Sequence, residues 1–198
     1  MRTSTLLIST FVAASSLVAT SARADEVIVA ADADYGHGGR RGVIVGATVD
    51  GGDMGCQTKG GEDCGGQKAA GGFSGHLGGM LTPRLALMGE VWAMGASQDN
   101  VTATQVIATA ALRGWVTRRL WLQGGLGFAR SNVTFDAGDG VMTTEESQTV
   151  PAFMAAIGVE IVRTHEFGLD LEARTGTGFY EGDARIYNGA VGVGASWF

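Results

Sequence analysis

The chain has 198 residues, a formal net charge of −6, 45% hydrophobic residues, 33 glycines and only two prolines. Removing residues 1–24 would take away Arg2 and Arg23 and no acidic residue, which leaves 12 basic and 20 acidic side chains. A chain this acidic lacks the basic face that nucleic acid requires, and its hydrophobic content argues against low-complexity disorder. No run of 18 apolar residues follows residue 24, so no membrane-spanning helix is expected.

The first 24 residues are typical of a secretory signal peptide. Arg2 provides a positive start, residues 6–19 are mostly apolar, and Ala22-Arg23-Ala24 fits a small-x-small cleavage site. We expect cleavage after Ala24, which leaves an N-terminal segment over residues 25–41. A retained N-terminal anchor is the alternative, but the apolar stretch is shorter than the ~20 residues that a spanning helix needs.

Alternation of apolar and polar residues with period two predicts eight strands over residues 42–198. In chain order the apolar faces are Val43, Val45, Ala47 and Val49; Phe73, Leu77 and Leu81; Leu85, Leu87, Val91 and Ala93; Val106, Ala108, Ala110 and Leu112; Leu120, Leu122, Leu126 and Phe128; Phe153, Ala155, Ile157, Val159 and Ile161; Phe167, Leu169, Leu171 and Ala173; and Val191, Val193, Ala195 and Trp197. A helix over residues 103–116 is the one alternative, and its β-branched residues favour a strand.

The connections between these strands alternate in length. Tight turns are expected at Thr82-Pro83, Thr117-Arg118 and Thr164-His165, and longer loops at about residues 50–68, 97–100, 134–148 and 179–185. This pattern is typical of an all-β fold, an eight-stranded antiparallel up-and-down transmembrane β-barrel with short periplasmic turns and longer outer loops.

The charged residues of the strands fall on the face opposite the apolar one. A cation facing lipid at the midplane costs ~2–4 kcal/mol, so in a membrane barrel these charges must face the lumen. The predicted polar network of the lumen is Glu90, Arg113, Gln123, Glu160, Asp170, Glu172, Arg174 and His76. A soluble, lipocalin-like barrel with its apolar face inward is the alternative.

Aromatic residues gather near the predicted strand ends, as an interfacial girdle would. The expected girdle is Trp121, Phe128, Phe153, Phe167, Tyr187 and Trp197. Trp92 and Trp115 instead share the inward phase, which requires either a partner for each indole N–H or a register shifted by one residue.

Cys56 and Cys64 are the only cysteines, and both lie in a polar, glycine-rich stretch. In an exported chain they are expected to form a disulfide. A metal site would need two further ligands, and no suitable residues lie nearby in the sequence. No cofactor is expected.

Together the signal peptide, the eight amphipathic strands and the unequal loops resemble the small outer-membrane β-barrels, the OmpA-type and OmpX-type transmembrane domains, over residues 42–198. The last ten residues end in Trp197 and Phe198 and resemble the C-terminal strand that the outer-membrane assembly machinery recognises. Here Trp197, and not the terminal residue, has the outward phase. The resemblance implies a monomer in the bacterial outer membrane whose partners are membrane lipids and the assembly machinery.

Function is less constrained, because one fold supports many activities. A barrel of envelope-structural or surface-interaction type without catalytic activity is the leading hypothesis. A narrow, porin-like channel for small solutes and a lipid-modifying barrel enzyme are the alternatives. Ser74 and His76 share the inward phase, but an enzyme acting on acyl chains would need them at the lipid face. Arginines gather at the turn end, at Arg84, Arg118, Arg119 and Arg163.

Overall fold

The computed structural model describes residues 40–58, 60, 66–98, 101–136, 142–146, 148–164, 166–180 and 184–198. The predicted signal peptide, its cleavage site and most of the segment 25–41 lie outside these residues. Within the described part of the chain, no helix is long and apolar enough to cross a membrane.

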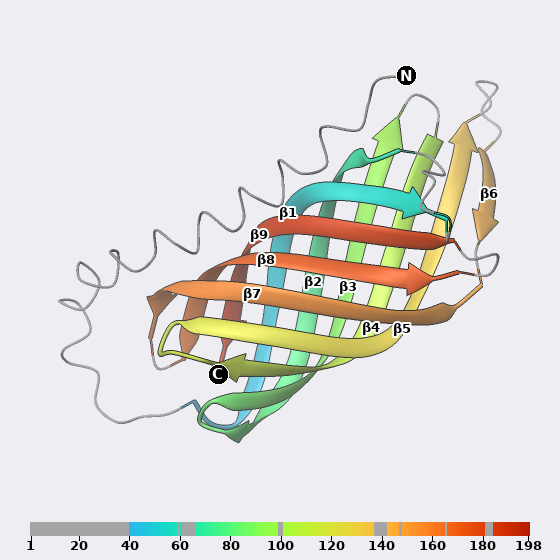
Figure 1. Ribbon diagram of the computed structural model, residues 1–198. Coiled ribbons are helices and arrows are strands. Elements are labelled where there is room, and N and C mark those ends of the chain that lie inside the picture. The colour runs from blue at the N-terminus through green and yellow to red at the C-terminus, as the bar shows by residue number, and fades with distance from the viewer. Residues whose placement is uncertain are drawn as a thin grey trace. The chain divides into compact units, whose positions relative to one another are not determined.

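Nine antiparallel strands form a single sheet (Figure 1). They are β1 (Val43–Gln57), β2 (Lys68–Thr82), β3 (Leu85–Gln98), β4 (Val101–Trp115), β5 (Leu120–Asp136), β6 (Met142–Glu146), β7 (Val150–Arg163), β8 (Phe167–Phe179) and β9 (Arg185–Trp197). Eight of them run in the order β4-β3-β2-β1-β9-β8-β7-β5, and the additional pairing of β4 with β5 closes the ring. The predicted eight-stranded, all-β barrel is confirmed.

Strand β6 lies outside the ring and was not predicted. It falls within the expected loop 134–148 and pairs only with residues 132–136 at the far end of β5 (Figure 1). The pairing of β5 with β7 ends at Ala129 and Val150, so the β5–β6 hairpin continues beyond the ring on that side. A five-residue strand rich in polar residues has too short an alternation to be recognised in the sequence.

The barrel strands are longer than a membrane requires. They range from 13 to 17 residues, whereas about 9–11 tilted residues cross the hydrocarbon core. The extra length lies mainly at the end with the longer loops, where β1 continues to Gln57. The prediction that Asp50 and Asp53 belong to a loop is therefore wrong. Glycines at 46, 51 and 52 obscured the continuing alternation of this strand.

The apolar phase of the strands faces outward. Leu126 is 75% exposed and Val191 is 67% exposed, and similar aliphatic or aromatic side chains cover the outside of all eight barrel strands. A soluble barrel would bury this phase around its lumen. A continuous exposed apolar surface of this size is instead the mark of a membrane-facing protein.

Two β-bulges interrupt the alternation. Both lie at the turn end of the barrel, which carries the tight turns β2–β3, β4–β5 and β7–β8 together with the start of β1 and the end of β9. The register shifts between Met80 and Thr82 and between Glu160 and Val162. The second bulge leaves Ile161 and Val162 both exposed. It therefore keeps two consecutive aliphatic side chains on the outer face, which strict alternation does not allow.

Inward-facing glycines make room for large side chains in the narrow interior. A Cβ atom on Gly158 of β7 would overlap the indole ring of Trp121 on β5, and one on Gly176 of β8 would lie 2.9 Å from Cζ3 of Trp92. Eight strands leave an interior just wide enough for side chains, so each bulky ring requires a glycine where it lies: on the neighbouring strand for Trp121, whose register partner is Gly158, and on a non-adjacent strand for Trp92.

We expect Gly158→Val to lower the free energy of unfolding by about 1–3 kcal/mol, the usual cost of overpacking a filled core. Urea unfolding in detergent micelles, followed by tryptophan fluorescence, measures this change. Gly124→Val is the matched control, since Gly124 faces outward and its Cβ would meet nothing within 4 Å. Equal stabilities of the two variants would show that Trp121 does not occupy this space.

Candidate functional site in the barrel interior

Inward-facing side chains fill the barrel in three levels, whose order can be read along β3. Ala86 and Met88 belong to the turn-end level, Glu90 to the middle level, and Trp92 and Met94 to the loop-end level. The middle level is polar and charged. It therefore lies between two mainly apolar levels.

Arg174 is the centre of the middle level. Its side chain is 1% exposed, and its Nη1 donates to Oε1 of Glu90 at 2.8 Å. Nη2 donates to the carboxylate of Glu172, and Nε lies 3.7 Å from Oδ2 of Asp50. One guanidinium thus faces three buried carboxylates from β1, β3 and β8, which joins strands that are distant in sequence.

A second branch of this network runs from Glu90 to Trp121. The amide of Gln123 donates to Glu90, and its Oε1 accepts from Nε of Arg113 at 2.8 Å. The Arg113 guanidinium lies 4.0 Å from the ring centroid of Trp121, a cation–π contact. The prediction that Trp121 belongs to an interfacial girdle is wrong, because its position has the inward parity of Gln123 and its ring is fully buried.

Glu160 lies apart from this network, in the turn-end level. Nη2 of Arg40 donates to both of its carboxylate oxygens, at 2.7 and 2.6 Å, and Nε1 of Trp115 donates to Oε1 at 2.8 Å. The Arg40 guanidinium also lies 4.2 Å from the ring centroid of Trp115. Sequence reasoning missed Arg40, because it precedes the first strand and has no alternating neighbours.

The inward tryptophans need no shift in register. Trp92 and Trp115 are both buried inside the barrel, and their strands pair with unbroken register at these positions, Trp92 with Ile107 and Trp115 with Trp121. Trp115 finds the partner that its indole N–H requires in Glu160. Of the other girdle residues, Phe128, Phe153 and Trp197 are exposed, and Phe167 and Tyr187 are half-buried.

His76 and Ser74 are both buried but do not form a pair. Nε2 of His76 lies 3.2 Å from Oγ of Ser196 on β9. Ser74 Oγ and Asp170 Oδ1 have no hydrogen-bond partner within the described residues. Asp170, a member of the polar network expected from the sequence, is buried inside the barrel.

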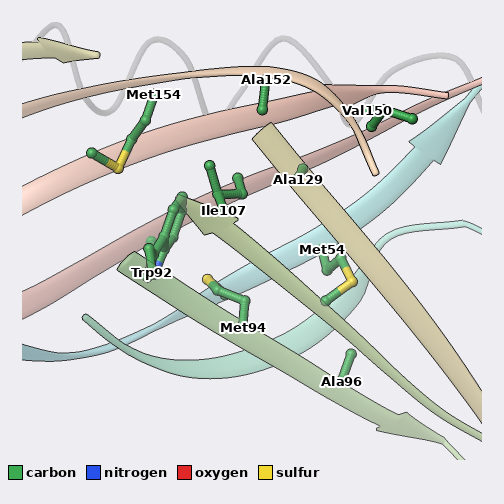
Figure 2. Close-up of a cluster of buried hydrophobic side chains, with 10 residues drawn as sticks. Met54, Trp92, Met94, Ala96, Ile107, Ala129, Val150, Ala152 and Met154 are labelled. Atoms are coloured by element: carbon green, nitrogen blue, oxygen red, sulfur yellow. The ribbon is translucent and has the colours of Figure 1, made fainter. Parts of the chain in front are cut away.

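The loop-end level combines an apolar cluster with a short polar chain. Figure 2 shows Trp92, Met94, Ile107 and Met154 pointing toward one another from β3, β4 and β7. The cluster comprises Met54, Trp92, Met94, Ala96, Ile107, Ala129, Val150, Ala152, Met154 and Ala190. Beside it, Nδ2 of Asn188 donates to Gln105 at 2.7 Å and Nε2 of Gln105 donates to the Tyr180 hydroxyl at 2.9 Å.

The two C-terminal aromatics point to opposite sides of the wall. Trp197 faces outward and packs edge-on against Phe167 at a centroid distance of 5.4 Å. Phe198 packs against the turn-end level, 6.3 Å from Trp115. Their role as an assembly signal stays a prediction. The disulfide between Cys56 and Cys64 also stays a prediction, because Cys64 lies outside the described residues.

These features define a closed β-barrel with an apolar exterior and a filled, partly charged interior. A family model described as outer membrane protein β-barrel domain matches residues 10–197, and the chain belongs to this family. A search of the curated proteins finds no match.

Solved structures share the fold at low sequence identity. The attachment invasion locus protein Ail of Yersinia pestis has 13% identity and a TM-score of 0.60, with 79% of this chain and 99% of that chain covered. Neisserial surface protein A has 13% identity and a TM-score of 0.55, with 78% and 96% covered. Similarity at this level establishes the architecture and does not transfer an activity.

Proposed function

We propose that this chain is a non-conducting, non-catalytic barrel of the bacterial outer membrane that presents its loop end for interactions at the cell surface. The observation that carries the proposal is the interior, which packed side chains fill at three successive levels. The signal peptide would be removed by cleavage after Ala24 during export, so the mature chain would begin at Asp25.

The filled interior argues against the channel hypothesis. An eight-stranded barrel leaves no room for an open pore once its inward side chains are large. Here Trp92, Trp115 and Trp121 are all inside and at most 4% exposed, and they lie above and below the Arg174 network. A solute would have to displace both apolar levels and separate buried ion pairs.

The position of the nucleophile candidates argues against the enzyme hypothesis. His76 is the one histidine in the described part of the chain, and it is 5% exposed within the lumen. Its partner Ser196 and its neighbour Ser74 are each 2% exposed. An acyl chain in the surrounding membrane could not reach these groups, and a nucleophile must contact its substrate.

The long strands at the loop end support a role at the surface. β5 has 17 residues, and its hairpin with β6 continues past the last pairing with β7. Strand residues beyond the ~11 needed for spanning must project from the membrane. The similarity in fold to Ail and neisserial surface protein A agrees with such a surface-exposed arrangement.

Single cysteines test the orientation that this proposal requires. In a Cys56→Ser, Cys64→Ser background, Thr149→Cys places an exposed thiol at the loop end and Glu166→Cys places one at the turn end. A membrane-impermeant maleimide should label Thr149→Cys in intact cells, and Glu166→Cys only after permeabilisation. Equal labelling of both thiols in intact cells, or labelling of neither, would contradict the proposal.

Planar-bilayer recordings test the non-conducting interior directly. The purified full chain should give no discrete openings above the membrane background, because buried side chains of the described residues occupy all three levels of the interior. Reproducible single-channel steps that depend on added protein would overturn the non-conducting part of the proposal and favour the narrow channel.

A further inference from the structure

The turn end of the barrel carries a ring of cations. We define the arginine rim as Arg41, Arg84, Arg118, Arg119 and Arg163, all of which are exposed or half-exposed. Glu166 is the one exposed acidic side chain in the described residues at this end. The rim thus combines five cations with a single exposed anion in a chain whose overall charge is negative. Nε of Arg163 also lies 3.9 Å from Oε2 of the buried Glu160.

Each turn places its arginine directly beside the apolar outer surface. Arg84 lies in the turn between the exposed residues Leu81 and Leu87, and Arg118 lies two residues after the exposed Val116. Arg163 follows the bulge that exposes Ile161 and Val162. The guanidinium groups can therefore extend from the edge of the apolar belt, where lipid headgroups lie, while their aliphatic stems contact apolar surface.

Hydrogen bonds bring two neighbouring turns of the rim together. The carbonyl oxygen of Arg118 accepts from Nη1 of Arg163 at 2.9 Å and from Nη2 of the buried Arg40 at 3.1 Å. The carbonyl oxygen of Arg119 accepts from the backbone N–H of Glu160 at 3.0 Å. These contacts fix the β4–β5 turn against the end of β7, so cations from distant parts of the sequence share one side of the barrel.

We propose that the arginine rim binds the phosphate groups of anionic phospholipids in the periplasmic leaflet of the membrane. Guanidinium groups form strong, often paired hydrogen bonds with phosphate oxygens. An anionic cell-wall polymer is the rival occupant, but it would lie beyond the headgroups, whereas these arginines border the belt itself. The inference rests on the proposed function, because it requires the turn end to face the periplasm within a membrane.

Native mass spectrometry of the full chain in neutral detergent, titrated with phosphatidylglycerol or phosphatidylcholine, tests the rim. The variant is the triple change Arg84→Gln, Arg118→Gln and Arg119→Gln. Because an arginine near an anionic surface contributes about fivefold in affinity, we expect at least a tenfold loss of phosphatidylglycerol binding and no change for phosphatidylcholine. The control, Arg130→Gln with Arg185→Gln, alters two exposed arginines away from the turn end and should change either lipid less than twofold.

Several results would overturn the inference. These are equal binding of both lipids by the wild type, no loss in the triple variant, or the same loss in the control. Retention on peptidoglycan that falls in the triple variant while phosphatidylglycerol binding stays unchanged would identify the polymer instead. If the triple variant fails to fold, the salt dependence of lipid binding by the wild type tests the inference instead. Its preference for phosphatidylglycerol over phosphatidylcholine should shrink at high salt. Failure of the wild type to insert into neutral vesicles would refute the proposed function, and not the rim alone.

Discussion

Replacing Arg174 with methionine is expected to lower the free energy of unfolding by about 3–5 kcal/mol, the usual cost of breaking a buried ion pair by removing one partner. The substitution keeps most of the side-chain volume but leaves Glu90, Glu172 and Asp50 without their shared cation. Buried carboxylates that lose their partner repel one another in a medium of low dielectric. The effect should therefore greatly exceed the loss of packing.

Urea titration in detergent micelles, read by the difference in gel mobility between folded and unfolded barrel, measures this change. Arg84→Met is the control, since Arg84 is exposed and should change stability by less than about 0.5 kcal/mol. Adding Glu90→Gln to Arg174→Met should recover part of the loss, because it removes one uncompensated charge. If Arg174→Met behaves like Arg84→Met, the buried network does not stabilise the barrel.

Leu171→Arg is expected to cost about 2–4 kcal/mol if its site lies near the bilayer midplane, and to slow insertion. Leu171 is exposed on the outer face of β8, between the buried positions Asp170 and Glu172. In a membrane its side chain contacts acyl chains, which cannot solvate a guanidinium. The cost therefore arises from the lipid and not from any contact within the protein.

Refolding into phospholipid vesicles, with the folded fraction measured across a urea series, tests this expectation. Thr102→Arg is the control, because Thr102 is also exposed on the outward phase but lies at the loop end of β4, where the cost of arginine should fall to about 0–1 kcal/mol. Equal costs at the two positions would indicate that the cost of an arginine on the outer surface does not depend on its depth in a bilayer.

The architecture could be predicted because it depends on a periodic signal. Successive strand residues face opposite sides, so charges such as Asp170 and Glu172 marked the inward phase of β8 without any knowledge of the strand pairing. Short turns between such strands then implied an up-and-down ring. The same parity placed Trp92 and Trp115 inside, which the structure shows to be correct.

The specific partners within the lumen could not be predicted, because they depend on register between strands. The sequence indicated that Glu160 and Arg174 face inward, but not that the first pairs with Arg40 and the second with Glu90. Asp50 was assigned to a loop because glycines weaken the alternation of β1. Trp121 was assigned to the girdle from its place near a strand end, although its parity already indicated the lumen.

The central claim, that the apolar outer face of the barrel contacts lipid, is tested most directly by fluorescence quenching at position 171. A bimane label is attached to Leu171→Cys in a Cys56→Ser, Cys64→Ser background, and the protein is placed in phospholipid vesicles. The label can then be quenched either from the lipid or from the water, and Thr149→Cys provides the water-exposed control. We expect brominated acyl chains to quench the label at 171 strongly and aqueous iodide to quench it weakly, with the opposite result at 149. Strong iodide quenching at 171 with no effect of brominated lipid would contradict the account.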